Sequence, residues 1–176
     1  MLKYPHPSLR APNLEIPIED LTGPGSEISI LAKEMFLVMY AARGVGLAAP
    51  QIGVNKCLMV YNESGDPKDW MGETVMVNPR IVEYSEGTDV EQEGCLSFPK
   101  IRGDVERSKW IKVEAMNLKG KVFKKKFKGW EARIFQHEYD HLDGKVFVDR
   151  LSPEGRGEAQ PSLDGLIADF GEGGAI

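Results

Sequence analysis

Two stretches of the chain repeat their apolar residues at the spacing of a helix. In residues 26–42, SEISILAKEMFLVMYAA, six apolar side chains share one helical face: Ile28, Leu31, Met35, Val38, Met39 and Ala42. Ser26 is a favourable N-cap, and Gly44 is a favourable stop signal. Helical spacing returns in residues 129–142. The pattern therefore predicts a helix over each of these two stretches.

Short runs with strand character lie between the two predicted helices. They are CLMVY (57–61), TVMVN (74–78), RIVEY (80–84), KWIKVEAMNL (109–118) and KVFKKKF (121–127), and KVFVDRL (145–151) follows the second helix. Lys119-Gly120 has the chemistry of a hairpin turn. The lysines at 124–126 are expected to be solvated. Strands joined mostly by hairpins and flanked by helices predict an α+β fold.

The last 25 residues differ in composition from the rest. From Ser152 onward one arginine stands against five acidic residues, among several glycines and two prolines. Such a composition favours disorder. We therefore predict one folded domain over residues 1–151 and a flexible acidic tail over residues 152–176, with a short helix near SLDGLIADF as the alternative.

Composition narrows the class of protein. Hydrophobic residues make up 41% and charged residues 28%, as in ordinary globular domains. Since no apolar run approaches the roughly 20 residues of a membrane span, no membrane partner is expected. A net charge of -5 argues against nucleic acid as a partner. Two cysteines are too few for a disulfide framework, and MLKYPHPSLR lacks the apolar segment of a secretory signal, so an intracellular protein is expected.

The glycine-rich stretch RGVGLAAPQIG, residues 43–53, fits a dinucleotide-binding pattern of the GxGxxA kind. That fingerprint follows a strand and opens a helix, whereas this stretch follows a predicted helix. Pro50 also disfavours helical dihedral angles at Ala49. No alternation of strands and helices comes after it. Nucleotide binding is therefore not expected here.

The second predicted helix contains an HExxH motif, formed by His137, Glu138 and His141 within QHEYDHLDG. Residues i and i+4 share a helix face, so both imidazoles can reach one metal ion. Glu138 is rotated by about 100° from His137 and can reach a water on the metal. Trp130 and Ile134 lie on the same stripe as the two histidines, so the ligands are expected to face the interior.

The third ligand distinguishes the classes of protein that share this motif. Zincin peptidases take a downstream Glu or His, but no histidine follows His141, and the later carboxylates lie in KVFVDRL or the acidic tail. Upstream, GCLSFP places Cys95 between Gly94 and Leu96, before a turn-forming proline. Cys95 is the better candidate, whereas Cys57 is expected to be a buried apolar residue on a strand. A zincin-like metallopeptidase and a non-catalytic metal-binding protein stay open as alternatives.

Three motifs occur together along the chain: GVGLAAPQIG (44–53), EGCLSFP (93–99) and QHEYDHLDG (136–144). In this order and approximate spacing they resemble the peptide deformylase family, from about Leu2 to Leu151. The opening LKYPHPSLR is similar to the N-terminal segment of that family. The EGCLSFP and RIFQHEYDHLDG segments are most similar to the group shared by many bacteria and plant organelles.

The resemblance implies an α+β fold in which mostly antiparallel strands surround a central helix that carries the HExxH motif. It implies a metal-dependent hydrolase that removes the N-formyl group from the initiator methionine of nascent polypeptides and releases formate. Cys95, His137 and His141 would hold one divalent ion per chain. In the family this is usually Fe(II), and Zn, Ni and Co are also accommodated.

The catalytic roles implied by the resemblance fall on three residues. Glu138 would be the general base toward the attacking water. The side-chain amide of Gln51 and the backbone N–H of Leu96 would stabilise the developing oxyanion. Because a purely structural metal site needs neither Glu138 nor Gln51, their presence disfavours the non-catalytic alternative.

The resemblance also implies a substrate site. The glycines around Val45, Gly46 above all, would let the substrate backbone approach and pair like a strand. Val45, Ile134 and Phe98 are expected as apolar walls for the methionine side chain, and Arg102 matches a position where the family often has Arg. The expected substrate-binding set is Gly44, Val45, Gly46, Gly94, Phe98, Arg102 and Ile134.

The expected partners are an N-formylmethionyl peptide and, transiently, the ribosome. Many bacterial family members end in a basic helix that docks on the ribosome, whereas the segment after Leu151 is acidic here. Docking through a basic tail is therefore not expected. The expected compartment is the bacterial cytoplasm, or a plastid or mitochondrion if a presequence has been removed.

Overall fold

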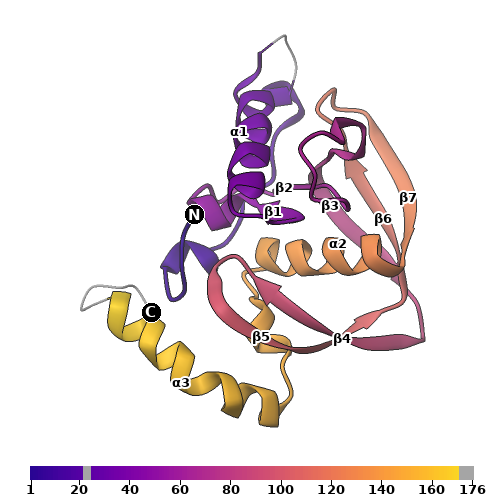
Figure 1. Cartoon of the computed structure of the whole chain (residues 1–176). Coiled ribbons are helices and arrows are strands. Elements are labelled where there is room, and N and C mark those ends of the chain that lie inside the picture. The colour runs from indigo at the N-terminus through magenta and orange to yellow at the C-terminus, as the bar shows by residue number, and fades with distance from the viewer. Residues whose placement is uncertain (22–24, 171–176) are drawn as a thin grey trace.

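The computed structural model describes residues 1–21 and 25–170 and has an α+β fold with mostly antiparallel strands (Figure 1). Its α-helices are α1 (Glu27–Ala41), α2 (Gly129–Leu142) and α3 (Pro153–Phe170). Its strands are β1 (Gly46–Ala48), β2 (Leu58–Tyr61), β3 (Thr74–Tyr84), β4 (Thr88–Cys95), β5 (Phe98–Ser108), β6 (Trp110–Met116) and β7 (Val122–Lys128). Among the described residues, no helix is both long and apolar enough to cross a membrane.

Five antiparallel strands form the larger sheet, in the order β1-β2-β3-β6-β7. Its inner face is apolar because side chains alternate along each strand: Ile111, Val113 and Ala115 of β6 are buried. The predicted strands at 74–78 and 80–84 are one strand, β3, whose pairing with β6 shifts register between Val77 and Arg80. The predicted hairpin turn joins β6 to β7, and Gly120 has a φ of 72° there.

A second sheet consists of the β4–β5 hairpin, which the hydrophobic pattern did not predict. The reason is that β4 and β5 carry few apolar residues: most of TDVEQEGC is exposed, and only Glu93 and Cys95 are buried. The pairing shifts register after Gly94, so that Cys95 faces Phe98 across a tight connection. This hairpin places Cys95 at the edge of a pocket.

Helix α1 forms close to where the pattern predicted it. The Ser26 hydroxyl accepts a hydrogen bond from the backbone N–H of Ser29 and so caps the helix. The C-terminal end differs from the prediction, because the left-handed residue is Arg43, with a φ of 57°, and not Gly44. Ala42, expected on the inner face, is exposed, since it already belongs to this irregular end.

Helix α2 covers the predicted residues 129–142 and follows directly on β7. It contacts strands of both sheets, including β1, β2 and β5, and Figure 1 shows it running between the larger sheet and the β4–β5 hairpin. Its apolar residues Ile134 and Phe135 join the core of the larger sheet. One face of α2 is thereby held against the pocket that β1 and β5 also line.

The C-terminal region corrects two expectations. The predicted strand at 145–151 is a 3₁₀ helix over Phe147–Arg150, and only Leu151 bridges to β5. The tail expected to be flexible forms α3 over Pro153–Phe170, and residues 171–176 lie outside the described residues. Ala159 and Leu163, one turn apart, are buried against the apolar cluster that includes Phe147, while the acidic residues stay outside. The short helix that was the alternative prediction near SLDGLIADF, residues 162–170, is the C-terminal half of α3.

Candidate metal centre and active-site pocket

Three ligand-type side chains converge from two elements. Cys95 ends β4, and His137 and His141 lie one turn apart on α2. Their ligand atoms all lie within 4.8 Å of one another, and the Cys95 Sγ lies 3.3 Å from the Nε2 of His141. Cys95 and His141 are buried, and His137 is partly buried. This is the ligand set expected from the sequence, brought together by the fold.

A carboxylate behind His137 fixes the orientation of its ring. The Nδ1 of His137 lies 2.8 Å from the Oε2 of Glu93, on the strand that ends at Cys95. With Nδ1 engaged, the Nε2 of His137 is left for a metal ion, as in many metal sites where a carboxylate holds the ligand imidazole. Glu93 and Cys95 are two residues apart on β4, so their side chains point to the same face.

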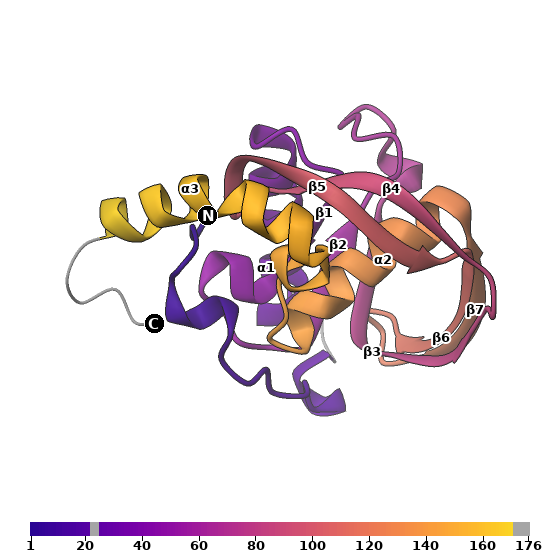
Figure 2. The ribbon, with the colours of Figure 1, turned by 90° about the horizontal axis from the view of Figure 1, so that it is seen from below.

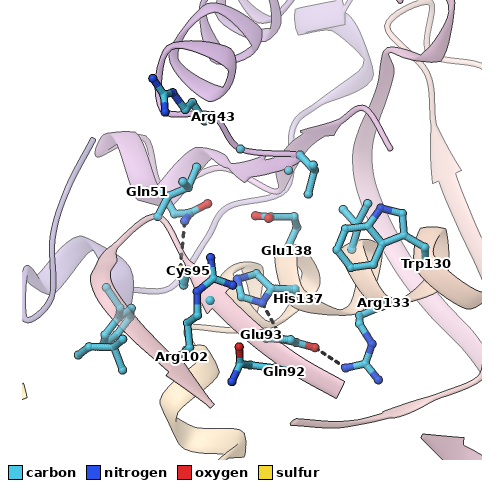
Figure 3. A pocket seen from close by; sticks show the side chains of 18 of the residues that line it. Arg43, Gln51, Gln92, Glu93, Cys95, Arg102, Trp130, Arg133, His137 and Glu138 are labelled. Carbon is cyan, nitrogen blue, oxygen red and sulfur yellow. Dashed lines mark hydrogen bonds and ion pairs between the residues drawn. The ribbon is translucent and has the colours of Figure 1, made fainter. Parts of the chain in front are cut away.

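Glu93 is itself held by two buried arginines. The Nε and one Nη of Arg107 donate to the two carboxylate oxygens, both at 2.9 Å. An Nη of Arg133 donates to the same carboxylate at 2.8 Å, as Figure 3 shows. Arg107 also pairs with Asp140, which pairs in turn with Arg150. Burial alone would raise the pKa of the Glu93 carboxyl, but His137 and Arg107 hold it well below its ordinary value. Glu93 is therefore a fixed anion.

The donors fit a transition-metal ion. Burial raises the pKa of the Cys95 thiol, but the adjacent imidazoles of His141 and His137 outweigh this and lower the pKa to about 5. Cys95 can therefore act as a thiolate ligand. One thiolate and two imidazoles suit zinc or iron, and three protein ligands leave a further position for water or substrate.

Glu138 lies beside the three ligands with no hydrogen-bond partner on one oxygen. Its side chain is 4% exposed, and its Oε2 has no partner among the described residues. Burial raises the pKa of Glu138 to about 7. Gly46 of β1 packs against it so closely that a Cβ on Gly46 would lie 2.5 Å from the Oε1 of Glu138. The pocket therefore holds a carboxyl group suited to taking up and releasing a proton near neutral pH.

Gln51 points its amide nitrogen toward the ligands. The backbone N–H of Ala48 donates to its Oε1 at 2.8 Å, which fixes the orientation of the amide. The Nε2 of Gln51 then lies 3.6 Å from the Cys95 Sγ and 3.3 Å from the Ser97 Oγ. Gln51 is buried, so it is a preorganised donor next to the candidate metal position.

These groups open into one pocket between the end of α1, β1, the β4–β5 hairpin and α2 (Figure 3). Ile134 and Val45 line it, and Trp130 stands at its mouth with 49% of its surface exposed. The indole nitrogen of Trp130 donates to the carbonyl of Glu63, which ties α2 to the loop after β2. The pocket thus has apolar walls at Val45, Ile134 and Trp130 and is polar around the three ligands.

Known proteins share this sequence and fold. The sequence profile of the family described as polypeptide deformylase matches residues 1–157. The chain is 40% identical over 167 residues to the peptide deformylase of Acinetobacter baumannii, which covers 95% of this chain and 90% of that one. A crystal structure of peptide deformylase from Plasmodium falciparum is 36% identical and matches with a TM-score of 0.90, covering 97% of this chain and 96% of that one.

The chain belongs to the polypeptide deformylase family. It is also 43% identical over 154 residues to the chloroplastic peptide deformylase 1B of Solanum lycopersicum, an alignment that covers 88% of this chain. It spans only 53% to 61% of the length of that protein and of two other plant relatives. Similar proteins therefore include both bacterial and chloroplastic deformylases.

The fold gathers every residue that the deformylase resemblance assigned. Those that line the pocket are Gly44, Val45, Gly46, Gln51, Gly94, Cys95, Leu96, Phe98, Arg102, Ile134, His137 and Glu138. His141 is 1% exposed and lies beneath them. Phe98 is 1% exposed and stacks on Tyr4, with ring centroids 4.9 Å apart, so its ring belongs mainly to the core.

Sequence reasoning missed Glu93, Arg107 and Arg133, and it placed Trp130 on the stripe of the ligand histidines without giving it a role in the site. Glu93 stands in the EGCLSFP motif, two residues before Cys95. Residues two apart on a strand point to the same face, and this spacing could have indicated that Glu93 lies beside the metal site. Arg133 lies four residues before His137 and so on the same side of the helix. Arg107 carried no usable signal, because its contacts depend on the pairing of two strands that the pattern did not predict.

Proposed function

We propose that this protein is a metal-dependent peptide deformylase, which removes the N-formyl group from the initiator methionine of nascent polypeptides and releases formate. The observation that carries the proposal is the arrangement of five side chains in the pocket. Cys95, His137 and His141 converge on a single point, with the unpartnered carboxyl of Glu138 and the amide of Gln51 beside it. Membership of the polypeptide deformylase family supports the same activity.

Cys95, His137 and His141 would hold the metal ion, with α2 as the central helix that carries the HExxH motif. A divalent ion held there would lower the pKa of a bound water and polarise the formyl carbonyl. Glu93 keeps the His137 ring turned so that its Nε2 faces the ligand cluster. The burial of Cys95 and His141 keeps competing water away from the ligand atoms.

Glu138 is the general base in this proposal. Its carboxylate takes the proton from the attacking water and passes it to the nitrogen of the leaving amine. Burial raises the pKa of the Glu138 carboxyl, which makes it a better proton acceptor than an exposed carboxylate. Since Gly46 has no side chain, the Glu138 carboxyl can lie against β1.

Gln51 and the backbone N–H of Leu96 would donate to the oxygen of the tetrahedral intermediate. The Gln51 amide cannot turn away, because the Ala48 N–H holds its oxygen. A preorganised donor of this kind contributes about 3 kcal/mol in the transition state. Both residues line the pocket at the ligand cluster.

The substrate peptide would lie along β1. This strand ends the larger sheet, so one of its edges can pair with an extended peptide. Val45 and Ile134 line the pocket and would be apolar walls for the methionine side chain, and Trp130, on the same stripe of α2, would add a third wall. Gly44, Gly94 and Phe98 would shape the same site, and Arg102 lies at its mouth.

We propose Fe(II) as the metal, with Zn, Ni or Co as alternatives. The thiolate of Cys95 adds negative charge to the ion and would blunt the acidity of zinc. Iron and thiolate are both oxidisable, so activity should decay faster in air than under argon. Equal lifetimes in air and under argon would argue against iron. The compartment, bacterial cytoplasm or organelle, stays a prediction.

The test is formate release from an N-formyl-Met-Ala-Ser peptide by protein purified under argon. We expect formate with all internal peptide bonds intact, loss of formate release with a chelator, and recovery when the metal is added back. Cleavage of an internal bond would favour a zincin-like peptidase. No formate from metal-loaded protein would favour a metal-binding protein without this activity.

A further inference from the structure

The β6–β7 hairpin differs sharply in charge from the rest of the molecule. Residues 109–128, named the basic hairpin, contain eight lysines and a single acidic residue, Glu114. The other 156 residues contain 14 basic and 26 acidic residues. The net charge of -5 therefore averages a strongly basic surface with an acidic remainder. Whole-chain charge, which argued against nucleic acid, does not describe this surface.

The lysines of the basic hairpin are all exposed. On β7, Lys124, Lys126 and Lys128 share the outer face, opposite to the buried Phe127. Alternate residues of a strand lie about 7 Å apart. Lys112 of β6 pairs directly with Lys126 in the register, and the Lys126 ammonium lies 3.4 Å from the centre of the Trp110 ring. The result is a row of cations arranged around one aromatic side chain.

Neighbouring carboxylates cancel only part of this charge. Lys112, Lys124 and Lys125 pair with Glu83, Glu114 and Glu131, respectively. Exposed pairs of this kind are weak and can exchange for another anion. These pairs involve three of the eight lysines of the basic hairpin.

Fold stability accounts for only part of this arrangement: Lys112 faces Glu83 of β3, and Lys124 faces Glu114 of β6, across neighbouring strands. Like charges directly opposite each other on neighbouring strands, as Lys112 and Lys126 are, destabilise a sheet. Lysines on an edge strand do protect against edge-to-edge aggregation, and β7 is an edge strand. However, Lys112 lies on β6, which is paired on both sides and needs no such protection. A local arrangement that opposes stability is typical of a functional surface.

The chemistry of the surface favours a phosphate backbone over a lipid surface. Binding in a membrane interface requires an apolar face beside the lysines. Val122 is the only large apolar side chain of the basic hairpin that is strongly exposed. A spaced row of lysines with little apolar surface is instead the electrostatic footprint of a nucleic-acid site.

The position of the basic hairpin relates it to the pocket. Lys128 precedes α2, and Trp130, two residues later, stands at the mouth of the pocket. Figures 1 and 2 place the hairpin at the end of the molecule opposite α3. Four acidic residues and one arginine lie on α3. An approaching polyanion would therefore be attracted to the basic hairpin and repelled by α3.

We propose that the outer face of the basic hairpin binds the phosphate backbone of RNA. If the protein is a deformylase, as proposed above, its substrate emerges from the ribosome, a particle with a surface rich in RNA. Docking through the basic hairpin would then hold the Trp130 side of the pocket near the emerging chain. This last step rests on the proposed function, whereas RNA binding itself does not.

The test is binding of a fluorescent 20-base-pair RNA duplex, measured by anisotropy across a series of salt concentrations. The variant is Lys124→Gln/Lys126→Gln/Lys128→Gln. Its matched control is Lys33→Gln/Lys68→Gln/Lys145→Gln, which removes the same charge from exposed lysines elsewhere. At about 50 mM salt we expect the hairpin variant to bind tenfold or more weakly than the control, and its salt slope to fall by about three. Melting temperatures check that all three proteins are folded.

Three results would overturn the proposal: no RNA binding by the unchanged protein at low salt, equal weakening in the hairpin and control variants, or tighter binding to phosphatidylserine vesicles than to RNA. Formate release from a free formyl-Met peptide is measured on the same samples and should be equal in all of them. If no sample releases formate, the proposed function fails while the RNA result still stands. If formate is released without RNA binding, only the present proposal fails.

Discussion

Gly46 of β1 lies against Glu138 of α2 so closely that a single methyl group on the glycine would sit 2.5 Å from the Glu138 Oε1. The sequence suggested that Gly46 is small to admit the substrate. The structure adds a second reason, because this glycine leaves room for the proposed general base.

Gly46→Ala should therefore lower turnover while leaving the metal bound, because the methyl group displaces the Glu138 carboxyl and not the ligands. A displacement on this scale costs roughly 100-fold in rate. Formate release and metal content are measured on the same sample. Gly157→Ala is the control, since a Cβ at Gly157 meets no atom within 4 Å. Full activity in the Gly46 variant would contradict the packing argument.

Cys95→Ala should empty the metal site, because two imidazoles alone hold a divalent ion weakly. Cys57→Ala is the matched control. Cys57 lies just before β2, half-buried rather than fully buried as expected, and it is not part of the cluster formed by Cys95, His137 and His141. Elemental analysis should find about one metal ion per chain in the control and almost none in the Cys95 variant. Equal metal content in the two variants would refute the ligand set.

Glu93→Gln should weaken metal binding without removing a ligand. Its carboxylate fixes the His137 ring, and losing such a contact typically costs 10- to 100-fold in metal affinity. Competition with a chelator measures that affinity. The variant should also melt at a lower temperature, because Arg107 and Arg133 lose their shared anion. A lower melting temperature with unchanged metal affinity would reduce Glu93 to a purely structural role.

The Arg10–Asp149 pair should make stability depend on pH at the acidic end. Burial alone would raise the pKa of Asp149, but the two hydrogen bonds from Arg10, both 2.8 Å, keep it below its ordinary value of 3.8. A lowered folded-state pKa stabilises the protein above the unfolded pKa, and this contribution is lost as the pH falls below about 3.8.

Asp149→Asn should therefore unfold more easily than the unchanged protein at pH 7, and the two should converge as the pH falls below 3.8. The pair is partly exposed, so the difference at pH 7 should be no more than about 1 kcal/mol. Denaturant unfolding at several pH values measures it. Asp104→Asn, on the exposed side of β5, should follow the unchanged protein throughout. A constant offset for Asp149→Asn at all pH values would contradict the assignment.

The sequence predicted the parts of the fold that depend on local pattern. Helix α2 was found with its observed bounds, because its periodicity and its HExxH motif agree. Four strands of the larger sheet, β2, β3, β6 and β7, were found from their apolar and β-branched residues, whereas the three-residue strand β1 was missed. The β4–β5 hairpin was missed because TDVEQEGC shows no apolar alternation. Of helix α3 only the short helix near SLDGLIADF was anticipated, as the alternative to a flexible tail, because the burial of Ala159 and Leu163 depends on tertiary packing.

The residues of the candidate site were likewise predictable only where residue type and spacing carried the signal. Cys95, His137, His141 and Glu138 could be named because their residue types and spacing carry metal chemistry. Arg107 could not, since it reaches Glu93 only through the register of β4 against β5. Trp130 was on the predicted stripe of α2, but its exposure at the mouth of the pocket follows from tertiary packing.

The most direct test of the central claim is the Glu138→Gln variant, with bound metal and formate release measured on the same sample. We expect one metal ion per chain, as in the unchanged protein, and formate release lowered by at least about 100-fold, because the ligands remain while the base is lost. Loss of the metal would mean that Glu138 belongs to the ligand set. Undiminished formate release would mean that another group takes the proton, and would contradict the assignment of Glu138 as the general base.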